Sequence, residues 1–298
     1  MLSVQPRTAS GAGKSREQII ADITKGIEDK TPKVIDLDMV TEKYPTNYNE
    51  SMNTVLTQEV IRYNRLLVIM ARMLKDVQKA LKGEIVMSDD LDALASSMFN
   101  NQVPAAFGSV GFLSLKPLSS WINDLNDRIN FIHEWIKNDC PAAFWLSGLF
   151  FPQAFFTGAL QNYARKHIIA IDELDYDFKV YDEIDPQDVT EKPADGVFCY
   201  GMYFEGARWN KTIHLLDESK PKQLYVEIPL IWYIPKRNRV KPTTGIYNCP
   251  VYKVLSRTGT LSTTGHSTNF VMWIELPTKE DENKWIRGGV AAFLALRY

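Results

Sequence analysis

The sequence predicts an α+β fold, in which an N-terminal helical bundle is followed by a small antiparallel β-barrel. Apolar residues recur at helical spacing through the first half of the 298-residue chain. Beyond residue 196, short runs rich in β-branched and aromatic residues alternate with Gly, Pro, Asn and Thr turns. A Pro- and Asp-rich linker at 185–196 separates the two patterns, so we place a domain boundary there.

The first helices follow from their start and stop signals. Ser15 followed by Gln18 forms a capping-box pattern, and the helix that it opens ends before Pro32. The longest helix is expected from Asn49 to Gly83, because its apolar residues fall on one stripe and Gly83 supplies an end. Both helices are therefore amphipathic, with one face for the core.

Two further helices and an uncharged segment complete the first half. Acidic residues at the start of 89–99 suit the positive end of a helix dipole, and Pro117 opens a helix that keeps a 3.6-residue period to Ile136. No charged residue occurs from 140 to 164, but Pro152 and several Gly and polar residues interrupt the stretch. We interpret it as a buried helical hairpin rather than a membrane span.

The second half reads as strands. The segment 171–185 alternates acidic with apolar residues, which predicts a half-exposed strand. The strand-like runs that follow are VFCYGMYFEG, QLYVEIPLIWYIP, IYNCPVYKVL and NFVMWIELP. Their spacing suggests a small antiparallel barrel or sandwich. The last segment, KWIRGGVAAFLALRY, fits either a helix or a strand.

The bulk composition excludes some classes of partner. The formal net charge of -2 gives no bias toward nucleic acid or an anionic membrane, so we expect neither as a partner. Cys140, Cys199 and Cys249 lie far apart, which favours a reducing, intracellular setting over a disulfide framework. The Ser, Gly and Ala content of 1–14 predicts a flexible leader.

Two motifs resemble ligand loops without meeting their requirements. The run GAGKS at 11–15 resembles the end of a phosphate-binding loop, but Thr8 stands where the first Gly is needed and no strand precedes it. Asp175 and Asp177 begin like a calcium loop, yet Val180 occupies the position that requires Gly. We therefore expect no cofactor-binding and no metal-binding residues in this chain.

The run GHSTN at 265–269 invites a serine hydrolase reading. Ser267 and His266 could in principle form part of a triad, because triads are recognised by geometry rather than by order. However, Asn269 stands where a second Gly is expected, and the context indicates a turn between strands. The favoured interpretation is a turn whose side chains hydrogen-bond their own backbone.

Arg208 and Trp209 lie beside a strand of aromatic residues. An Arg next to an exposed Trp is typical of an interface anchor. The alternative is that Trp209 fills the barrel and Arg208 bonds a loop carbonyl, and the sequence gives no exposure that would decide between them.

Four long stretches resemble the C-terminal end of dynein heavy chains. They are YPTNYNESMNTVLTQEVIRYNRLL at 44–67, PAAFWLSGLFFPQAFFTGALQNYARK at 141–166, GMYFEGARW at 201–209 and CPVYKVLSRTGTLSTTGHSTNFV at 249–271. The resemblance covers nearly all of the chain after residue 15. The forms ARW and STTGHSTNFV look closer to axonemal than to cytoplasmic heavy chains.

The resemblance implies an organisation and a location. Residues 15–100 would hold the helices that close the sixth AAA+ module and lead into the C-terminal region. Residues 101–185 would form the helical bundle of the C-terminal domain, and 186–298 its β-barrel subdomain. The location implied is the cytoplasm and cytoskeleton, in a ciliary or flagellar axoneme.

The resemblance also implies a function without chemistry in this segment. The family's C-terminal domain braces the AAA+ ring and modulates motility, with the AAA+ modules of the same heavy chain as partners. ATP, magnesium, microtubules and other dynein subunits would be bound elsewhere in the parent protein, a microtubule motor ATPase. Candidate interface residues are Arg208, Trp209, His266 and Ser267. The alternatives are a stand-alone β-barrel that binds a ligand or peptide, and a serine hydrolase using Ser267 and His266.

Overall fold

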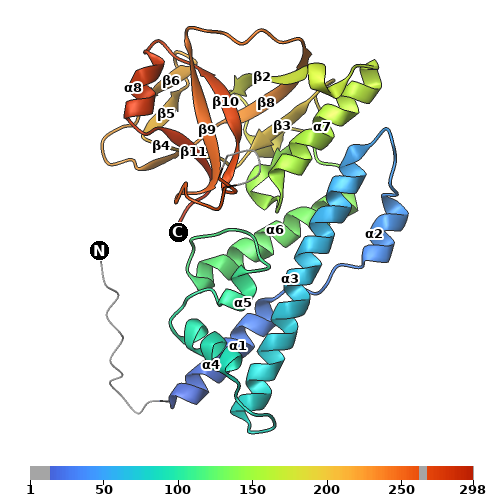
Figure 1. Ribbon diagram of the computed structural model, residues 1–298, viewed down its shortest axis with the longest axis vertical. Helices are drawn as coiled ribbons and strands as arrows, with labels where there is room; N and C mark the ends of the chain where they lie inside the picture. The colour runs from blue at the N-terminus through green and yellow to red at the C-terminus, as the bar shows by residue number, and fades with distance from the viewer. Residues whose placement is uncertain (1–13, 262–266, 298) are drawn as a thin grey trace.

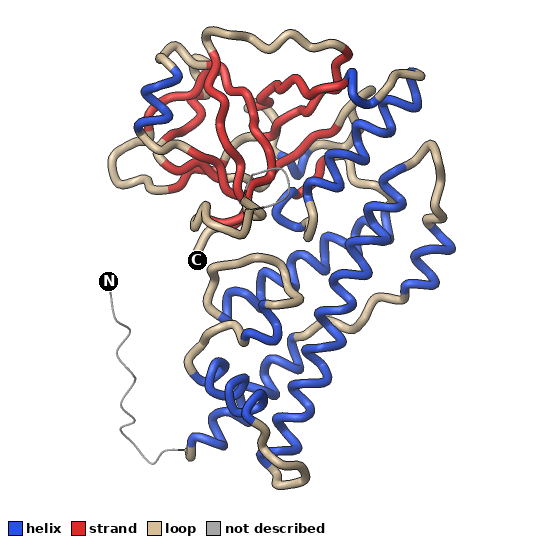
Figure 2. Tube along the Cα trace, in the orientation of Figure 1, coloured by secondary structure: helices blue, strands red, loops and turns tan. Residues whose placement is uncertain are grey.

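The computed structural model describes residues 14–261 and 267–297, with helices at one end of the molecule and strands at the other (Figures 1 and 2). The helices of the first part are α1 (Arg16–Lys30), α2 (Leu37–Lys43), α3 (Ser51–Leu81), α4 (Asp89–Phe99), α5 (Ala105–Gly108) and α6 (Leu118–Asn138). A further helix, α7 (Pro152–His167), contacts both α3 and the sheets. This helix therefore joins the two parts.

The helices that the apolar spacing predicts are confirmed as α1, α3, α4 and α6. The Ser15 hydroxyl accepts a hydrogen bond from the Gln18 N–H, and the Gln18 side chain accepts from the Ser15 N–H, so the capping box is present. The buried stripe of α3 includes Val60, Leu67 and Leu74, none of which exceeds 1% exposure. Short α2 and α5 were not predicted, because neither is long enough to show a period.

The strands form two larger sheets and one pair. The four-stranded sheet has the order β1 (Ala143–Trp145), β3 (Val197–Tyr200), β8 (Leu230–Arg237), β2 (Leu174–Tyr181). The five-stranded sheet has the order β10 (Phe270–Pro277), β9 (Ile246–Val254), β11 (Ala291–Ala295), β4 (Tyr203–Glu205), β7 (Tyr225–Glu227). The remaining pair is β5 (Ala207–Asn210) with β6 (Leu215–Glu218).

The expected antiparallel β-barrel requires a correction, because the described strands form open sheets. The end strands, β1 and β2 in one sheet and β10 and β7 in the other, do not pair to close a ring. Two pairings, β1 with β3 and β11 with β9, are parallel. Alternation along the sequence marks a strand, but closure depends on tilt and register between distant segments, which alternation does not encode.

The helical hairpin expected in the uncharged segment also requires a correction. Only its second arm is a helix, α7, which begins with Pro152 at its first turn. The first arm is strand β1, followed by the 3-10 turn η1 (Leu146–Gly148). The partner that makes β1 a strand is β3, more than fifty residues away. Within the described ranges, no helix combines the length and apolar character needed to cross a membrane.

The C-terminal segment contains both of the structures that its sequence allowed. Helix α8 (Glu282–Arg287) ends at Gly288, and β11 follows. Gly289 has φ +66°, a conformation that glycine adopts without strain, and it turns the chain from helix into strand. The short 3-10 turns η2 (Ile171–Glu173) and η3 (Pro186–Asp188) flank β2.

One hydrophobic core extends through both parts of the molecule. Aromatic rings form a continuous path from β1 through α7 to β8, with ring centroids 4.5 Å apart for Phe144 and Phe155, 5.2 Å for Phe155 and Phe156, and 4.7 Å for Phe156 and Tyr233. Strands β1 and β2 precede the predicted boundary near residue 185 yet belong to the four-stranded sheet. The division into domains stays a prediction.

Candidate functional site

Arg208 and Trp209 lie on β5 and make contacts inside the sheet part. The Arg208 guanidinium pairs with Asp217 on β6. Trp209 is buried, and its indole N–H donates to Asp182 Oδ2 at 2.6 Å. His214 Nδ1 lies 2.8 Å from the same oxygen, and although burial opposes it, these two hydrogen bonds hold the pKa of Asp182 below its usual range. These contacts favour the internal role, and a role at an interface stays a prediction.

Ser267 lies in the turn before β10. Its hydroxyl accepts a hydrogen bond from the Asn269 N–H at 3.1 Å. Asn269 is fully buried and pairs with the backbone of Val254, with Oδ1 accepting at 2.9 Å and Nδ2 donating at 3.1 Å. The expected bonding of a turn side chain to the turn's own backbone is confirmed for Ser267, whereas the Asn269 side chain bonds the backbone of β9 instead. His266 lies outside the described residues, so a Ser267–His266 pair stays a prediction.

The motifs that resemble ligand loops have structural roles where they are described. Ser15 caps α1, and Lys14 Nζ pairs with Asp22 at 2.6 Å, while residues 11–13 lie outside the described ranges. Asp175 and Asp177 pair with lysines of the sheet part. Across the described part of the chain, no group of three or more His, Cys, Asp or Glu side chains is placed to hold a metal ion.

The junction between helices and sheets contains a buried carboxylate, Glu59 of α3. It accepts hydrogen bonds from the N–H groups of Phe150 at 2.5 Å and Phe151 at 2.9 Å, just before α7. These N–H groups at a helix start would otherwise lack an acceptor. Burial raises the pKa of Glu59, although the two backbone bonds and the charges of Arg62 and Arg128 act in the opposite direction. Glu59 therefore fixes the entry of α7 against α3.

A buried guanidinium, Arg128 of α6, lies beside this carboxylate. Its Nε donates to Asp124 Oδ2 at 3.2 Å, and its Cζ lies 4.0 Å from the ring centre of Phe112. Burial would lower the pKa of Arg128, but Tyr63 and Asp124 raise it, so the guanidinium stays protonated. The Tyr63 hydroxyl donates to the Gly148 carbonyl at 2.7 Å. Buried polar groups thus connect α3 to the turn before α7, and Arg128 pairs with Asp124 within α6.

Ser147 links the same turn to the sheets. Its buried hydroxyl lies between the carbonyl oxygens of Gly201, at 2.5 Å, and Leu294. A hydroxyl has a single hydrogen, so it donates to one of these carbonyls at a time. Gly201 has φ +84°, and a Cβ there would lie 2.3 Å from Trp145, so only glycine fits this close approach.

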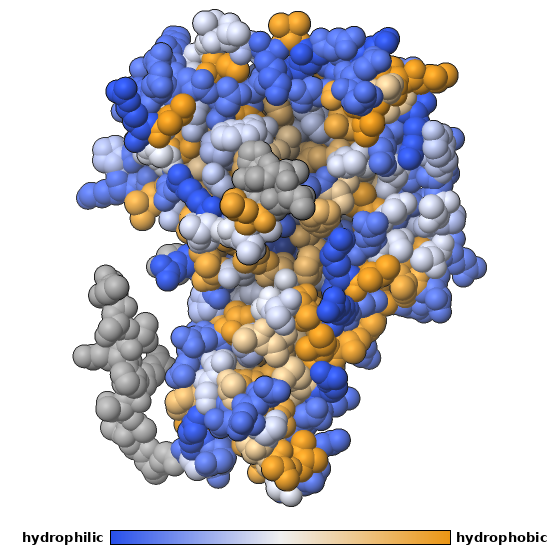
Figure 3. All heavy atoms as spheres, viewed as in Figure 1, coloured by the Kyte–Doolittle hydropathy of each residue, from blue (hydrophilic) through white to orange (hydrophobic). Residues whose placement is uncertain are grey.

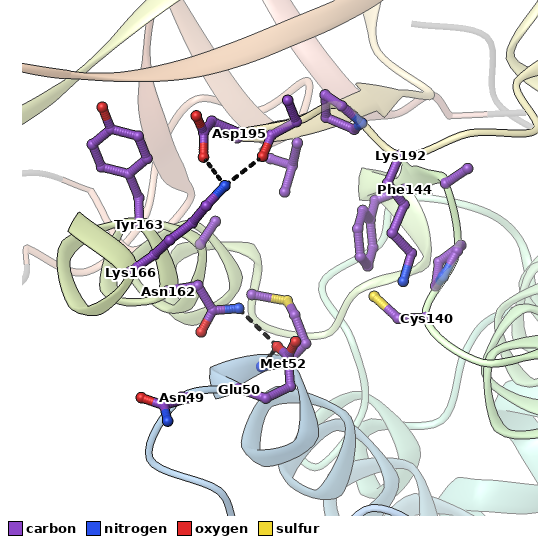
Figure 4. A pocket seen from close by; sticks show the side chains of 17 residues that line it. Asn49, Glu50, Met52, Cys140, Phe144, Asn162, Tyr163, Lys166, Lys192 and Asp195 are labelled. Carbon is purple, nitrogen blue, oxygen red and sulfur yellow. Dashed lines mark hydrogen bonds and ion pairs between the residues drawn. The ribbon is translucent and has the colours of Figure 1, made fainter.

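A cavity of about 470 Å³ opens where the start of α3, α7 and the loop before β3 meet (Figure 4). On one wall the Asn162 amide donates to Glu50 at 2.7 Å, and Lys166 Nζ pairs with Asp195 at 2.6 Å. Cys140 lies on the opposite wall. Four of the polar side chains at the cavity are thus bonded to one another in two pairs.

Cys140 is unsuited to nucleophilic chemistry in this cavity. Burial raises the pKa of its thiol to about 11, although the charge of Lys192 acts in the opposite direction. The reactive form of cysteine is the thiolate, which is scarce at neutral pH when the pKa is so high. The Cys140 thiol is therefore not activated as a nucleophile in this environment.

A second cavity, of about 670 Å³, lies against β9, β10 and α8. Trp273 and Ile286 are 48% and 58% exposed at this cavity. Its wall includes Glu275, which forms a buried ion pair with Arg239. Asp177 is a second partner of Arg239, at 3.2 Å, so β2 and β10 are connected through one guanidinium.

The buried charged residues near the junction were not predicted from the sequence, although the sequence contains a signal for them. Glu59, Asp124 and Arg128 each fall on the buried stripe of a helix, where a charge is expensive unless it is paired. Asp124 and Arg128 are also spaced four residues apart, as a helical ion pair requires. What the sequence does not show is that Glu59 bonds a helix start ninety residues away.

The fold packs helices against open sheets, and the buried side chains of Glu59, Tyr63 and Ser147 bond the turn before α7 to α3 and to the sheet part. The protein belongs to the family of C-terminal domains of dynein heavy chains, whose family model matches residues 1–294. This confirms the resemblance noted in the sequence.

Axonemal heavy chains are similar to this protein over nearly its whole length. It is 49% identical to dynein axonemal heavy chain 1 of Homo sapiens over 100% of its residues. It is 43% identical to human dynein axonemal heavy chain 3 over 99%, and 45% identical to human dynein axonemal heavy chain 12 over 96%. The matched region spans only 7%, 7% and 9% of these three relatives. The similarity points to the cytoskeleton and the ciliary or flagellar axoneme as the location.

Proposed function

We propose that this chain is a structural module that braces the AAA+ motor ring of an axonemal dynein heavy chain and modulates microtubule-based motility. The observation that carries the proposal is the buried connection at the junction, where Glu59 and Tyr63 of α3 bond the backbone leading into α7. Close-packed interiors of this kind transmit strain rather than absorb it. A module that resists or relays ring movement requires such stiffness.

The partners in this proposal are the other AAA+ modules of the same heavy chain. Microtubules, other dynein subunits, ATP and magnesium belong to the parent protein, since the matched segment is about 7% of the relatives' length. The capping role of Ser15 supports a structural use of the P-loop-like run. We propose no catalytic residue, nucleic-acid contact or membrane contact for this segment.

The bracing role is tested in the full heavy chain by loosening the junction. In Glu59→Gln one of the two backbone N–H groups loses its acceptor, because an amide offers a single oxygen. We expect microtubule-stimulated ATP turnover to change by about fivefold, the scale of a modest coupling energy. Gln58→Ala is the control, since Gln58 is the exposed neighbour on the same helix. Equal turnover in both variants and the parent would contradict bracing.

A second measurement tests whether this segment binds or hydrolyses ATP. Thermal melting of the chain with and without Mg-ATP, together with phosphate release, is expected to show no shift and no turnover. Binding to the folded state would raise the melting temperature by mass action. Stabilisation accompanied by turnover would establish a nucleotide site near residues 11–15 and overturn the proposal.

Capture of a small ligand or peptide is the second candidate function, and the junction cavity of about 470 Å³ is the observation that favours it. Ala142→Trp would fill this cavity with an indole. If ligand capture is the function, this variant loses motility while the protein stays folded. If bracing is the function, motility is retained.

A further inference from the structure

The exposed face of α3 carries an unusual line of side chains. Six exposed residues recur at alternating spacings of four and three along this face: Ile61, Arg65, Val68, Arg72, Lys75 and Lys79. This spacing keeps them on one side of a helix. At 1.5 Å per residue, the line extends for about 27 Å. Figure 3 shows hydrophobic atoms interspersed with hydrophilic ones over the helical end of the molecule. We call these six residues the α3 stripe.

Among the residues that the structure describes, the cations of the α3 stripe form no ion pair with a carboxylate. No carboxylate of the described residues lies within 4.0 Å of Arg65, Arg72, Lys75 or Lys79. Helix α3 contains two acidic residues, Glu59 and Asp76. Glu59 is buried and bonded to backbone N–H groups. The whole chain has a formal net charge of -2, so this positive line is a local departure from the overall balance.

Like charges at these spacings destabilise a helix. Lys75 has Arg72 three residues before it and Lys79 four residues after it, and each such pair costs about 0.2–0.5 kcal/mol. Ile61 and Val68, at 48% and 53% exposure, add apolar surface to the same line. An acidic partner surface with apolar residues of its own would neutralise the repulsion and cover both side chains.

The positive surface continues toward the sheets. The ring of Phe151, 38% exposed, lies between two cations, with Arg62 Cζ at 5.2 Å and Lys253 Nζ at 5.6 Å from its centre. Lys253 is partly buried, and no described carboxylate lies within 4.0 Å of it. Burial lowers the pKa of Lys253, and Glu59 offsets this only in part. A buried or half-buried cation without a carboxylate gains from an incoming acidic side chain.

We propose that the α3 stripe, together with Arg62, Phe151 and Lys253, is a docking face for an acidic, partly apolar segment of another module of the same heavy chain. This inference rests on the proposed bracing function and names the chemistry of one contact that bracing requires. The relatives are more than ten times longer than the matched region, so the same polypeptide offers ample surface for this contact. The exposed Ile61 and Val68 favour a protein surface over a phosphate backbone.

Zero-length carbodiimide cross-linking of the full heavy chain tests the contact, because this reagent joins a lysine amine only to a carboxylate that touches it. We expect Lys75, Lys79 or Lys253 to be joined to Asp or Glu residues outside the 298-residue segment, as read by peptide mass spectrometry. High salt should reduce these products, since the Debye length falls from about 8 Å to about 3 Å at 1 M.

Charge reversal supplies the functional readout. In Arg65→Glu/Arg72→Glu/Lys75→Glu, we expect the Lys79 and Lys253 products to disappear and microtubule-stimulated turnover to change by about fivefold. All three positions are exposed, so the melting temperature of the isolated chain should stay close to that of the parent. Lys211→Glu/Lys220→Glu/Lys279→Glu is the matched control, with the same charge change at exposed lysines of the sheet part.

The outcomes separate this inference from the bracing function. If other lysines of the segment are joined to the rest of the heavy chain but those of the docking face are not, the inference fails and bracing stands. If no lysine of the segment is joined to the rest, both fail. Products that join the docking face only to added tubulin, or equal effects of the two triple variants, would also overturn the inference.

Discussion

The inner and outer faces of α3 differ in whether their charged side chains have bonding partners within the fold. On the inner face, the Glu59 carboxylate accepts two backbone hydrogen bonds and Tyr63 donates one. On the outer face, Arg65 and Lys75 lie in solvent without a described acidic neighbour within 4.0 Å. The same helix thus presents hydrogen-bonded polar groups to the core, and solvated cations without a described carboxylate partner to its surroundings.

This difference separates stability from recognition. A buried charge must be compensated within the fold, because leaving it unpaired costs several kcal/mol. An exposed charge is solvated by water at little cost, and its removal changes stability only slightly. The inner polar groups of the helix therefore hold the fold together, and the outer cations are available to a partner.

The largest effect is expected at Arg128. Arg128→Met keeps much of the side-chain volume but leaves Asp124 with only its 3.3 Å contact to Lys116. Breaking a buried pair in this way costs about 3 kcal/mol. Arg65→Met makes the same chemical change on the outer face of α3 and is expected to alter stability by less than about 0.5 kcal/mol. Urea unfolding followed by far-UV circular dichroism measures both, and similar losses would erase the distinction between a buried, paired charge and an exposed one.

A smaller loss is expected for Tyr63→Phe. The ring remains in place, but the buried carbonyl of Gly148 loses its donor, which costs about 1.5 kcal/mol. Tyr48→Phe is the control, because Tyr48 is 73% exposed. The same urea titration measures the difference between them. A parent-like midpoint for Tyr63→Phe would show that water replaces the hydroxyl and that this bond adds no stability to the junction.

Asp177 is only partly buried, and the contribution of its ion pairs to stability can be tested by changing the pH. Partial burial opposes ionisation, but the hydrogen bond from Lys236 and the charges of Lys236 and Arg239 hold the pKa of Asp177 below its ordinary value of 3.8. A lowered pKa adds stability above the unfolded value, and this stability is lost as the pH falls through the folded value. Asp177→Asn should therefore melt below the parent at pH 7, and the gap should narrow below pH 3.8. The exposed Glu84→Gln is the control, and a gap independent of pH would contradict the ion-pair account.

How far the sequence predicts this structure depends on the range of the interactions. Ser15 and Gln18 specify the start of α1 within four residues, so the capping box is readable from the sequence and is present. The α3 helix is readable for the same reason, because its apolar stripe is local. The pairing of Phe144 on β1 with Cys199 on β3 has no local signal, and the barrel and the helical hairpin were wrongly expected for this reason.

The same limit applies to the candidate site. The sequence left open whether Trp209 is an interface anchor or a buried side chain, because its burial and its bond to Asp182 depend on segments that meet only in the folded protein. Glu59 could be noted as a charge on an apolar stripe, but the N–H groups that donate to it, those of Phe150 and Phe151, lie ninety residues away. The exposed stripe of α3 depends only on helical periodicity, which is local and therefore readable from the sequence.

The smallest change in stability is expected for a substitution on the outer face of α3. Whether this change is a gain or a loss is what tests the proposed docking face. Lys75→Met removes a cation that lies between Arg72 and Lys79 and so relieves two like-charge pairs, and the isolated chain should gain about 0.4–1 kcal/mol at low salt. The gain should fade at high salt, because screening already weakens the repulsion in the parent. Melting temperatures at about 10 mM and 1 M salt, where the Debye lengths are about 30 Å and 3 Å, measure the change. In the full heavy chain the sign should reverse, because the proposed docking places Lys75 against an acidic partner. A stabilisation that persists in the full heavy chain would mean that the outer face of α3 meets solvent alone.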